Sequence, residues 1–216
     1  MRRQGLDLRL VISLLALVLI AGVVALLAVG GSSGAPHRST VAGQPKYESA
    51  GLLTPIRAAP PLTLRNYLGQ PVSIASYRGK AVLVTFLYTH CPDICPLITS
   101  QLRVAQNLMG PATAAKAEII AVSVDPRGDT PKAVAAFLAR HEMTGRMQYL
   151  VGSTRELASA WSAWGVGSER DAQKPEFINH SGLIFGVGGS GQRITLYAPN
   201  FQPAEIAHDV PLLAAH

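Results

Sequence analysis

The apolar residues of this chain fall into two kinds of stretch: short continuous runs, and longer runs that repeat every three or four positions. Residues 81–88 and 119–124 are continuous apolar runs rich in β-branched side chains, which is typical of strands buried on both faces. Between them, residues 93–109 place apolar side chains at steps of three and four, which predicts a helix. The sequence therefore predicts a strand, a helix and a second strand, the unit from which parallel sheets are built.

Shorter segments before and after this unit complete the expected order of elements. Thr130 and Pro131 are typical of a helix start, as its cap and its first residue. Gly110 and Pro111 are expected to end the first helix. The other expected segments are strands at 61–64, 71–74 and 149–151, helices at 131–141, 154–164 and 203–213, a polar loop at 165–176, and a hairpin of 183–187 with 193–197.

This order places the only two cysteines of the chain at a strand end. Cys91 and Cys95 lie where the strand 81–88 meets the following helix, and ligands of α/β folds bind at the carboxyl ends of strands. Strands that alternate with helices and end in a hairpin and a closing helix predict an α/β fold. The expected class is a thioredoxin-like fold, with a central mixed β-sheet flanked by helices and the thiols after a central strand.

The spacing of the two cysteines is compatible with more than one chemistry. Four positions apart on one helix, their Cβ atoms would be ~5–6 Å apart, whereas a disulfide needs ~3.8 Å. A soft metal would therefore fit without strain, and a disulfide after local rearrangement. Pro92 suits the first turn of a helix, and the positive end of that helix favours thiolates. Because a thiolate is both a metal ligand and a redox nucleophile, the spacing alone leaves metal binding and redox chemistry open.

The N-terminal region has a different composition from the rest of the chain. Residues 10–29 carry no charge and are almost entirely apolar, which is long enough to span a bilayer as one transmembrane helix. We interpret them as a retained anchor, because a cleaved signal peptide usually has an apolar core of only ~7–15 residues. The three arginines of residues 1–9 place that end in the cytoplasm, or in the matrix of a mitochondrion.

The segment after this anchor is expected to be a tether. Residues 30–51 are rich in Gly, Ser, Pro and Ala and show little periodicity, which is typical of a flexible linker. Residues 52–216 then form the folded domain, which is long enough for one hydrophobic core. The net charge of the chain is +6. The chain has no basic cluster interleaved with aromatics, which argues against nucleic-acid binding.

Six histidines are candidates for a third ligand beside the cysteines. His90 adjoins Cys91, but neighbours on an extended segment point in opposite directions, so it is a weak candidate. His180 lies between the polar loop and the hairpin, a junction that thioredoxin-like folds bring close to the cysteine helix. Its surroundings taken alone favour a hydrogen-bonded surface histidine. The other four, interpreted as solvated or structural, are His37, His141, His208 and His216.

The chain resembles the Sco/SenC family of membrane-anchored copper proteins in three motifs. These are Thr89-His90-Cys91-Pro92-Asp93-Ile94-Cys95-Pro96, then Ser123-Val124-Asp125-Pro126 with Asp129-Thr130-Pro131, and finally His180-Ser181. The order of anchor, tether and thioredoxin-like domain is also similar. Without the resemblance, Asp125 and Asp129 are better explained by turn formation and helix capping than by catalysis.

The resemblance implies a copper site and a partner. In the family, the two cysteines and the distant histidine bind one copper ion, Cu(I) or Cu(II), which carried over makes Cys91, Cys95 and His180 the metal ligands. The ligand chemistry agrees, because thiolates select Cu(I) and imidazole accommodates Cu(II). The implied function is a metallochaperone, not an enzyme, that delivers copper to the binuclear site of cytochrome c oxidase subunit II. Many family members carry Asp where this chain has Asn179, which bears on copper affinity.

The resemblance also implies a location. The domain is expected to face the periplasm or cell exterior from the bacterial inner membrane, or the intermembrane space from the mitochondrial inner membrane. Other periplasmic copper carriers or thioredoxin-like reductases are further expected partners.

Three other functions remain open from the sequence. A thiol–disulfide oxidoreductase that keeps partner cysteines reduced would need Cys91 and Cys95 but not His180. A peroxidase would need an activating arginine near the reactive cysteine, and none accompanies Thr89 locally. A redox or copper sensor is indistinguishable from a chaperone at this level.

Overall fold

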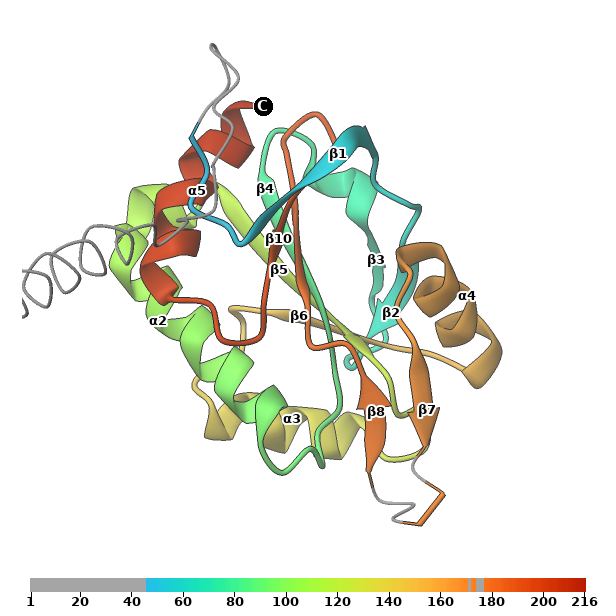
Figure 1. Cartoon of the computed structure of the whole chain (residues 1–216). Coiled ribbons are helices and arrows are strands. Elements are labelled where there is room, and N and C mark those ends of the chain that lie inside the picture. Colours follow the sequence, from blue (N-terminus) through green and yellow to red (C-terminus); the bar gives the residue numbers. More distant parts are fainter. Residues whose placement is uncertain (1–45, 171, 174–176) are drawn as a thin grey trace, which may run out of the picture. The chain divides into compact units, whose positions relative to one another are not determined.

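The computed structural model describes residues 46–170, 172–173 and 177–216, and its framework is a set of strands at the following positions (Figure 1). In chain order they are β1 (Gly51–Ala58), β2 (Thr63–Asn66), β3 (Pro71–Ser73), β4 (Ala81–Leu87), β5 (Ala117–Ser123), β6 (Gln148–Val151), β7 (Ser168–Arg170), β8 (Ile178–His180), β9 (Ile184–Val187) and β10 (Gln192–Tyr197).

Eight of these strands form one mixed sheet in the order β1-β10-β9-β4-β5-β6-β2-β3. Strands β4, β5 and β6 are parallel, whereas β9 pairs with β4 in the antiparallel sense. A second, two-stranded antiparallel sheet consists of β7 and β8. The expected central mixed sheet is therefore confirmed.

Local sequence signals explain where the helices begin and end. The helices are α2 (Ile94–Ala114), α3 (Pro131–Arg140), α4 (Thr154–Trp164) and α5 (Pro203–Ala215), with a 3-10 turn at Ile74–Tyr77. The Thr130 side chain accepts a hydrogen bond from the Ala133 N–H at the start of α3, as its sequence predicts. Helix α4 starts with a capping box and ends at Gly165, which has a left-handed φ of 69°.

The helices cover both faces of the sheet (Figure 1). Helix α2 packs against α5, and Ser100 on α2 contacts the His141 ring at the end of α3 at 3.3 Å. Helix α4 lies on the other side, where its Trp164 packs against Phe86 of β4 and Phe185 of β9. The predicted flanking of the sheet by helices is thus also confirmed.

Three expectations about individual elements are corrected by the structure. Gly110 does break the helix, with a φ of 68°, but a short helical turn continues from Pro111 to Ala114. Strand β1 was not predicted, because Pro55 interrupts the segment and its half-buried and exposed positions do not alternate strictly. The segment 165–176 is not wholly a loop, since it contains β7.

The predicted anchor at 10–29 and most of the predicted tether lie outside the described residues. No described helix is long and apolar enough to cross a membrane.

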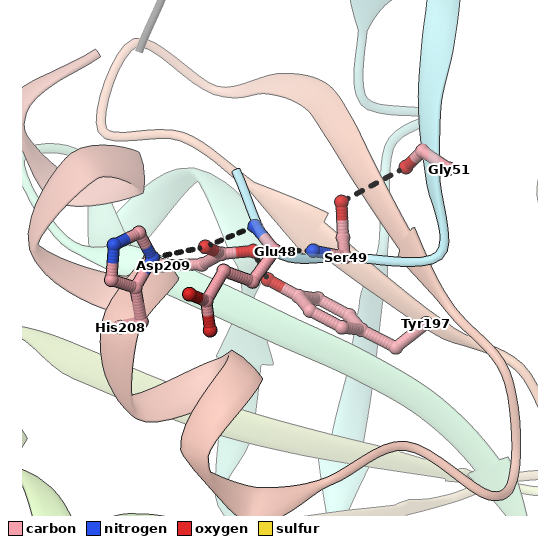
Figure 2. Close-up of polar contacts among 6 residues, drawn as sticks. All are labelled: Glu48, Ser49, Gly51, Tyr197, His208 and Asp209. Carbon is pink, nitrogen blue, oxygen red and sulfur yellow. Dashed lines mark hydrogen bonds and ion pairs between the residues drawn. The ribbon is translucent and has the colours of Figure 1, made fainter. Parts of the chain in front are cut away.

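The described chain is fixed to the domain at its start by one buried carboxylate (Figure 2). Asp209 on α5 is fully buried and accepts hydrogen bonds from the backbone N–H groups of Glu48 at 2.8 Å and Ser49 at 3.0 Å. The Tyr197 hydroxyl also donates to it at 2.9 Å, and His208 Nδ1 lies 2.9 Å away. This carboxylate therefore joins segments more than 150 positions apart in the chain.

Replacing this carboxylate should destabilise the domain. In Asp209→Asn one acceptor oxygen becomes a donor that faces other donors, so we expect the free energy of unfolding to fall by about 2–3 kcal/mol. Chemical denaturation measures it, with Glu205→Gln on the same helix as the control, expected within about 0.5 kcal/mol of wild type. Equal midpoints for the two variants would show that the Asp209 contacts contribute nothing.

Candidate dithiol and histidine site

The cysteine segment leaves the sheet at the end of its most buried strand. Every residue of β4 is buried, and its last residue, Leu87, is paired with Ser123 of β5. The Val124 N–H donates to the Leu87 carbonyl at 2.9 Å, which holds the two strand ends side by side. The segment that follows β4 then turns, with the Cys91 N–H donating to the Tyr88 carbonyl at 3.3 Å.

Helix α2 starts later than the sequence predicted. Its cap is Asp93, whose side chain accepts from the Ile94 N–H at 2.5 Å, so Pro92 precedes the helix and does not form its first turn. Cys91 therefore lies in the turn before the helix, and only Cys95 is helical. The cysteines do not share a helix face as expected; Cys91 instead lies in front of the helix end.

The Cys91 sulfur receives a hydrogen bond from that helix end. The Cys95 N–H points at Cys91 Sγ at 3.4 Å, and Cys91 Sγ is 3.6 Å from Asp93 Oδ1. Both cysteines are free thiols, Cys91 6% and Cys95 0% exposed. Burial of the two sulfur atoms disfavours a charge on either, whereas the hydrogen bond from the Cys95 N–H favours a charge on Cys91.

Hydrogen bonding separates the pKa values of the two thiols. The Cys95 side chain is the largest influence on Cys91, and with the Cys95 N–H it lowers the pKa of Cys91 to about 6 against the effect of burial. The same contact with Cys91, followed by burial, raises the pKa of Cys95 far above its usual range. At neutral pH the pair therefore consists of a Cys91 thiolate and a Cys95 thiol.

His180 reaches this pair from strand β8. Its Nε2 lies 3.7 Å from Cys95 Sγ, although the two residues are 85 positions apart. Burial lowers the pKa of His180, while the nearby Ser181 backbone acts weakly in the opposite sense. The ring is therefore neutral at pH 7, the form in which an imidazole binds metal. Its Nδ1 is buried and makes no hydrogen bond of normal geometry within the described residues.

The distances fit a metal between Cys95 and His180. With metal–sulfur and metal–nitrogen bonds of ~2.3 and ~2.0–2.1 Å and an angle near ~110–120°, the two ligand atoms would be ~3.6–3.8 Å apart. The observed 3.7 Å agrees. Among the described side chains, however, no group of three His, Cys, Asp or Glu is arranged to hold a metal as it stands. A site with Cys91, Cys95 and His180 as ligands therefore requires these side chains to move, and their role as ligands stays a prediction.

Asp129, in the loop after β5, is hydrogen-bonded to the cysteine segment. Its carboxylate is 4% exposed and accepts from the Thr89 N–H at 2.8 Å, the Ser123 hydroxyl at 2.6 Å and the Tyr149 hydroxyl at 2.9 Å. Burial raises the pKa of Asp129, and these hydrogen bonds oppose the rise. The residue thus ties the β4–α2 turn to the loop after β5, a role that the Asp-Pro motif alone did not reveal.

The remaining histidines lie as the sequence suggested or outside the described residues. His90 is exposed, with its Nδ1 3.1 Å from the Thr89 hydroxyl. His141 packs on Phe137, His208 contacts Asp209, His216 is exposed, and His37 is not described. Asn179 is exposed on β8, where neighbouring side chains alternate between faces, so it points away from the side occupied by His180.

Sequence reasoning missed Tyr88. Its ring is 3% exposed and meets the His180 ring edge-on, with centroids 5.7 Å apart at 78°. Burial is the main cause that raises its pKa to about 12. The residue immediately follows an apolar strand, which gave no reason to separate it from the core.

The fold and this cluster define a class: a thioredoxin-like protein whose two thiols, at the end of a central strand, are met by a histidine from a distant strand. Residues 53–215 match the SCO1/SenC family. The chain therefore belongs to the SCO1/SenC family, as the motifs indicated.

Relatives in sequence and structure agree with this assignment. The mitochondrial protein SCO1 homolog of Mus musculus is 26% identical over 160 residues, covering 72% of this chain and 55% of the relative. ScoI of Bradyrhizobium japonicum, solved with copper bound, is 29% identical with a TM-score of 0.61, covering 73% of this chain and 99% of that one.

A third relative is described by a redox property. BsSco, described as having a disulfide switch and as a member of the Sco family of cytochrome c oxidase assembly proteins, is 26% identical with a TM-score of 0.62, over 74% of this chain and 94% of that one. The chain spans about half the length of the mitochondrial relatives it matches.

The difference between the two thiols can be tested by alkylation. Because the pKa of Cys91 is lowered, its thiolate is present above about pH 6 and lost below it. The rate of reaction with iodoacetamide should therefore fall as the pH drops through about 6. Peptide mapping should find the adduct on Cys91, with Cys95 unmodified up to pH 8. Labelling of Cys95 first would reverse the assignment.

Proposed function

We propose that this protein is a copper metallochaperone that binds one copper ion through Cys91, Cys95 and His180. The observation that carries the proposal is the 3.7 Å contact between Cys95 Sγ and His180 Nε2, which joins distant parts of the chain at a metal-compatible spacing. The copper-bound structure of the Bradyrhizobium relative supports copper as the metal. The proposed recipient of the copper is subunit II of cytochrome c oxidase, during assembly of that enzyme.

The ligand set suits a metal that is held and then released. Two thiolates and a neutral imidazole around Cu(I) carry a net charge of −1, which the start of α2 would favour. Copper binding would also displace the proton of Cys95, so affinity would depend on pH. Three ligands leave coordination positions through which the thiols of a partner can displace them one at a time.

The proposed location follows from the N-terminal sequence. Residues 10–29 would anchor the protein in the bacterial inner membrane, with residues 52–216 as the copper-binding domain facing the periplasm or cell exterior. The mitochondrial inner membrane is the alternative, and the mitochondrial relatives are the observation that favours it.

A second candidate function is thiol–disulfide exchange with a partner's cysteines. The observation that favours it is the division into a Cys91 thiolate and a Cys95 thiol, since a thiolate attacks a disulfide and the neighbouring thiol then resolves the mixed disulfide. The reaction would reduce the partner's disulfide and leave a disulfide between Cys91 and Cys95. The disulfide switch described for BsSco fits the same chemistry.

Copper stoichiometry tests the proposed ligands directly. In reducing buffer we expect one copper per chain in the wild-type domain, and loss of tight binding in Cys91→Ser and Cys95→Ser, because soft thiolates dominate Cu(I) affinity. His180→Ala should weaken Cu(II) binding by at least tenfold and Cu(I) binding less. Metal analysis and competition titration give these values, with His216→Ala as an exposed histidine control expected to match wild type. Wild-type affinity in either serine variant would place the site elsewhere.

The same histidine separates the two functions. Thiol–disulfide exchange at Cys91 and Cys95 does not require an imidazole, so His180→Ala should exchange with a model disulfide at nearly the wild-type rate. Copper transfer to an oxidase subunit should fail in this variant. Normal oxidase assembly with His180→Ala would contradict the chaperone and favour the reductase.

A further inference from the structure

The segment that joins His180 to strand β9 packs closely against the start of helix α2. Gly182, in the middle of this segment, is buried. A Cβ atom added to Gly182 would lie 3.2 Å from Ile98 Cδ1 and 3.3 Å from Pro199 Cγ, closer than ordinary van der Waals contact. Ile98 lies one helical turn beyond Cys95 on α2. The lack of a side chain at Gly182 therefore lets the backbone come close to the helix turn that carries this cysteine.

Space, rather than backbone conformation, is the reason for a glycine at this position. Gly182 is not among the glycines of the described chain that have a left-handed φ, so alanine could adopt its conformation. The two neighbours have little room to move, since the Ile98 side chain is fully buried and Pro199 is a closed ring. An added methyl group would therefore push the segment away from α2.

This displacement would reach His180, because the other end of the segment is fixed to the main sheet. The Leu183 carbonyl accepts a hydrogen bond from the buried Thr85 hydroxyl of β4 at 3.1 Å, and β9, which begins at Ile184, pairs with β4. His180 lies on β8, which in the described chain pairs with β7 in a separate sheet. The strand pairing of the main sheet therefore fixes the chain after Gly182 but not the chain before it.

We infer that Gly182 is a positioning residue of the copper site, which sets the distance between His180 and Cys95 by allowing close approach to α2; this inference rests on the proposed function. The distance in question is the 3.7 Å between Cys95 Sγ and His180 Nε2. Because metal–ligand bonds stay within about 0.2 Å of their usual lengths, a displaced His180 ring would no longer share a metal ion with Cys95 at full strength.

The test is Gly182→Ala, which adds one methyl group at the point of close approach. In the copper-free domain, the nuclear Overhauser effect between the His180 ring and the Cys95 side chain should be lost. Cu(II) affinity should fall about tenfold, as is typical when the surroundings of a metal ligand are disturbed. The matched control is Gly167→Ala, just before β7, where an added Cβ would meet nothing within 4 Å. It should match wild type in both measurements.

A second variant shows whether the contact with α2 is the cause. Ile98→Val removes the Cδ1 atom that the added methyl group would approach most closely. Combining Gly182→Ala with Ile98→Val should therefore restore the Overhauser effect and most of the Cu(II) affinity, and Ile98→Val alone should keep both near wild type. General destabilisation would not be reversed in this way, because the effects of independent substitutions add.

The copper-free measurement separates this inference from the proposed function. A wild-type Overhauser effect in Gly182→Ala, or no recovery when Ile98→Val is added, would overturn the inference. Should the wild-type domain bind no copper, the proposed function would fail by itself, and the Overhauser effect would still decide whether Gly182 sets the approach of His180 to Cys95.

Discussion

The arrangement of the site depends on how β4 is held inside the sheet. Every residue of this strand is buried, with β5 bonded along one edge and β9 along the other. A strand held on both edges and covered on both faces has one register, because a slip by one residue would turn its side chains to the opposite faces. The position at which the chain leaves the sheet, and hence the position of Cys91, follows from that register.

Two hydrogen bonds fix the turn that follows β4 relative to the strand. Asp129 holds the Thr89 N–H from the loop after β5, and the Tyr88 carbonyl accepts from the Cys91 N–H. The start of α2 then stabilises negative charge on one sulfur but not on the other. A pair of chemically identical residues thus acquires two different roles, one as the charged group and one as a proton carrier at neutral pH.

The sequence predicted the fold well because its signals were strong and local. The apolar run of β4, the cap of α3 and the hairpin after residue 183 each appear within a few neighbouring residues. Strand β1 was missed because its partner, β10, lies far along the chain, and the β7–β8 pair was missed because three-residue strands are too short for a clear alternating pattern. The helix start was misplaced because Pro92 suits the first helical position, whereas in the structure Asp93 is the cap and the helix begins after it.

The candidate ligands were identified by family resemblance, and the contact between Cys95 and His180 needed the fold. The contacts of Tyr88 and Asp129 were not predictable from their neighbours, because an apolar strand end and an Asp-Pro turn are explained without them. Such residues become visible only when segments from separate elements meet.

The way in which the chain joins the domain has a mechanical consequence. Strand β1 is an edge strand, which among the described strands pairs with β10 alone, and a pull on its leading end would open such a pair one hydrogen bond at a time. Asp209 accepts hydrogen bonds from the backbone ahead of β1, at Glu48 and Ser49. A force arriving along the preceding chain therefore loads helix α5 first. The force is then shared with α2, on which α5 packs, before it can separate β1 from the edge of the sheet.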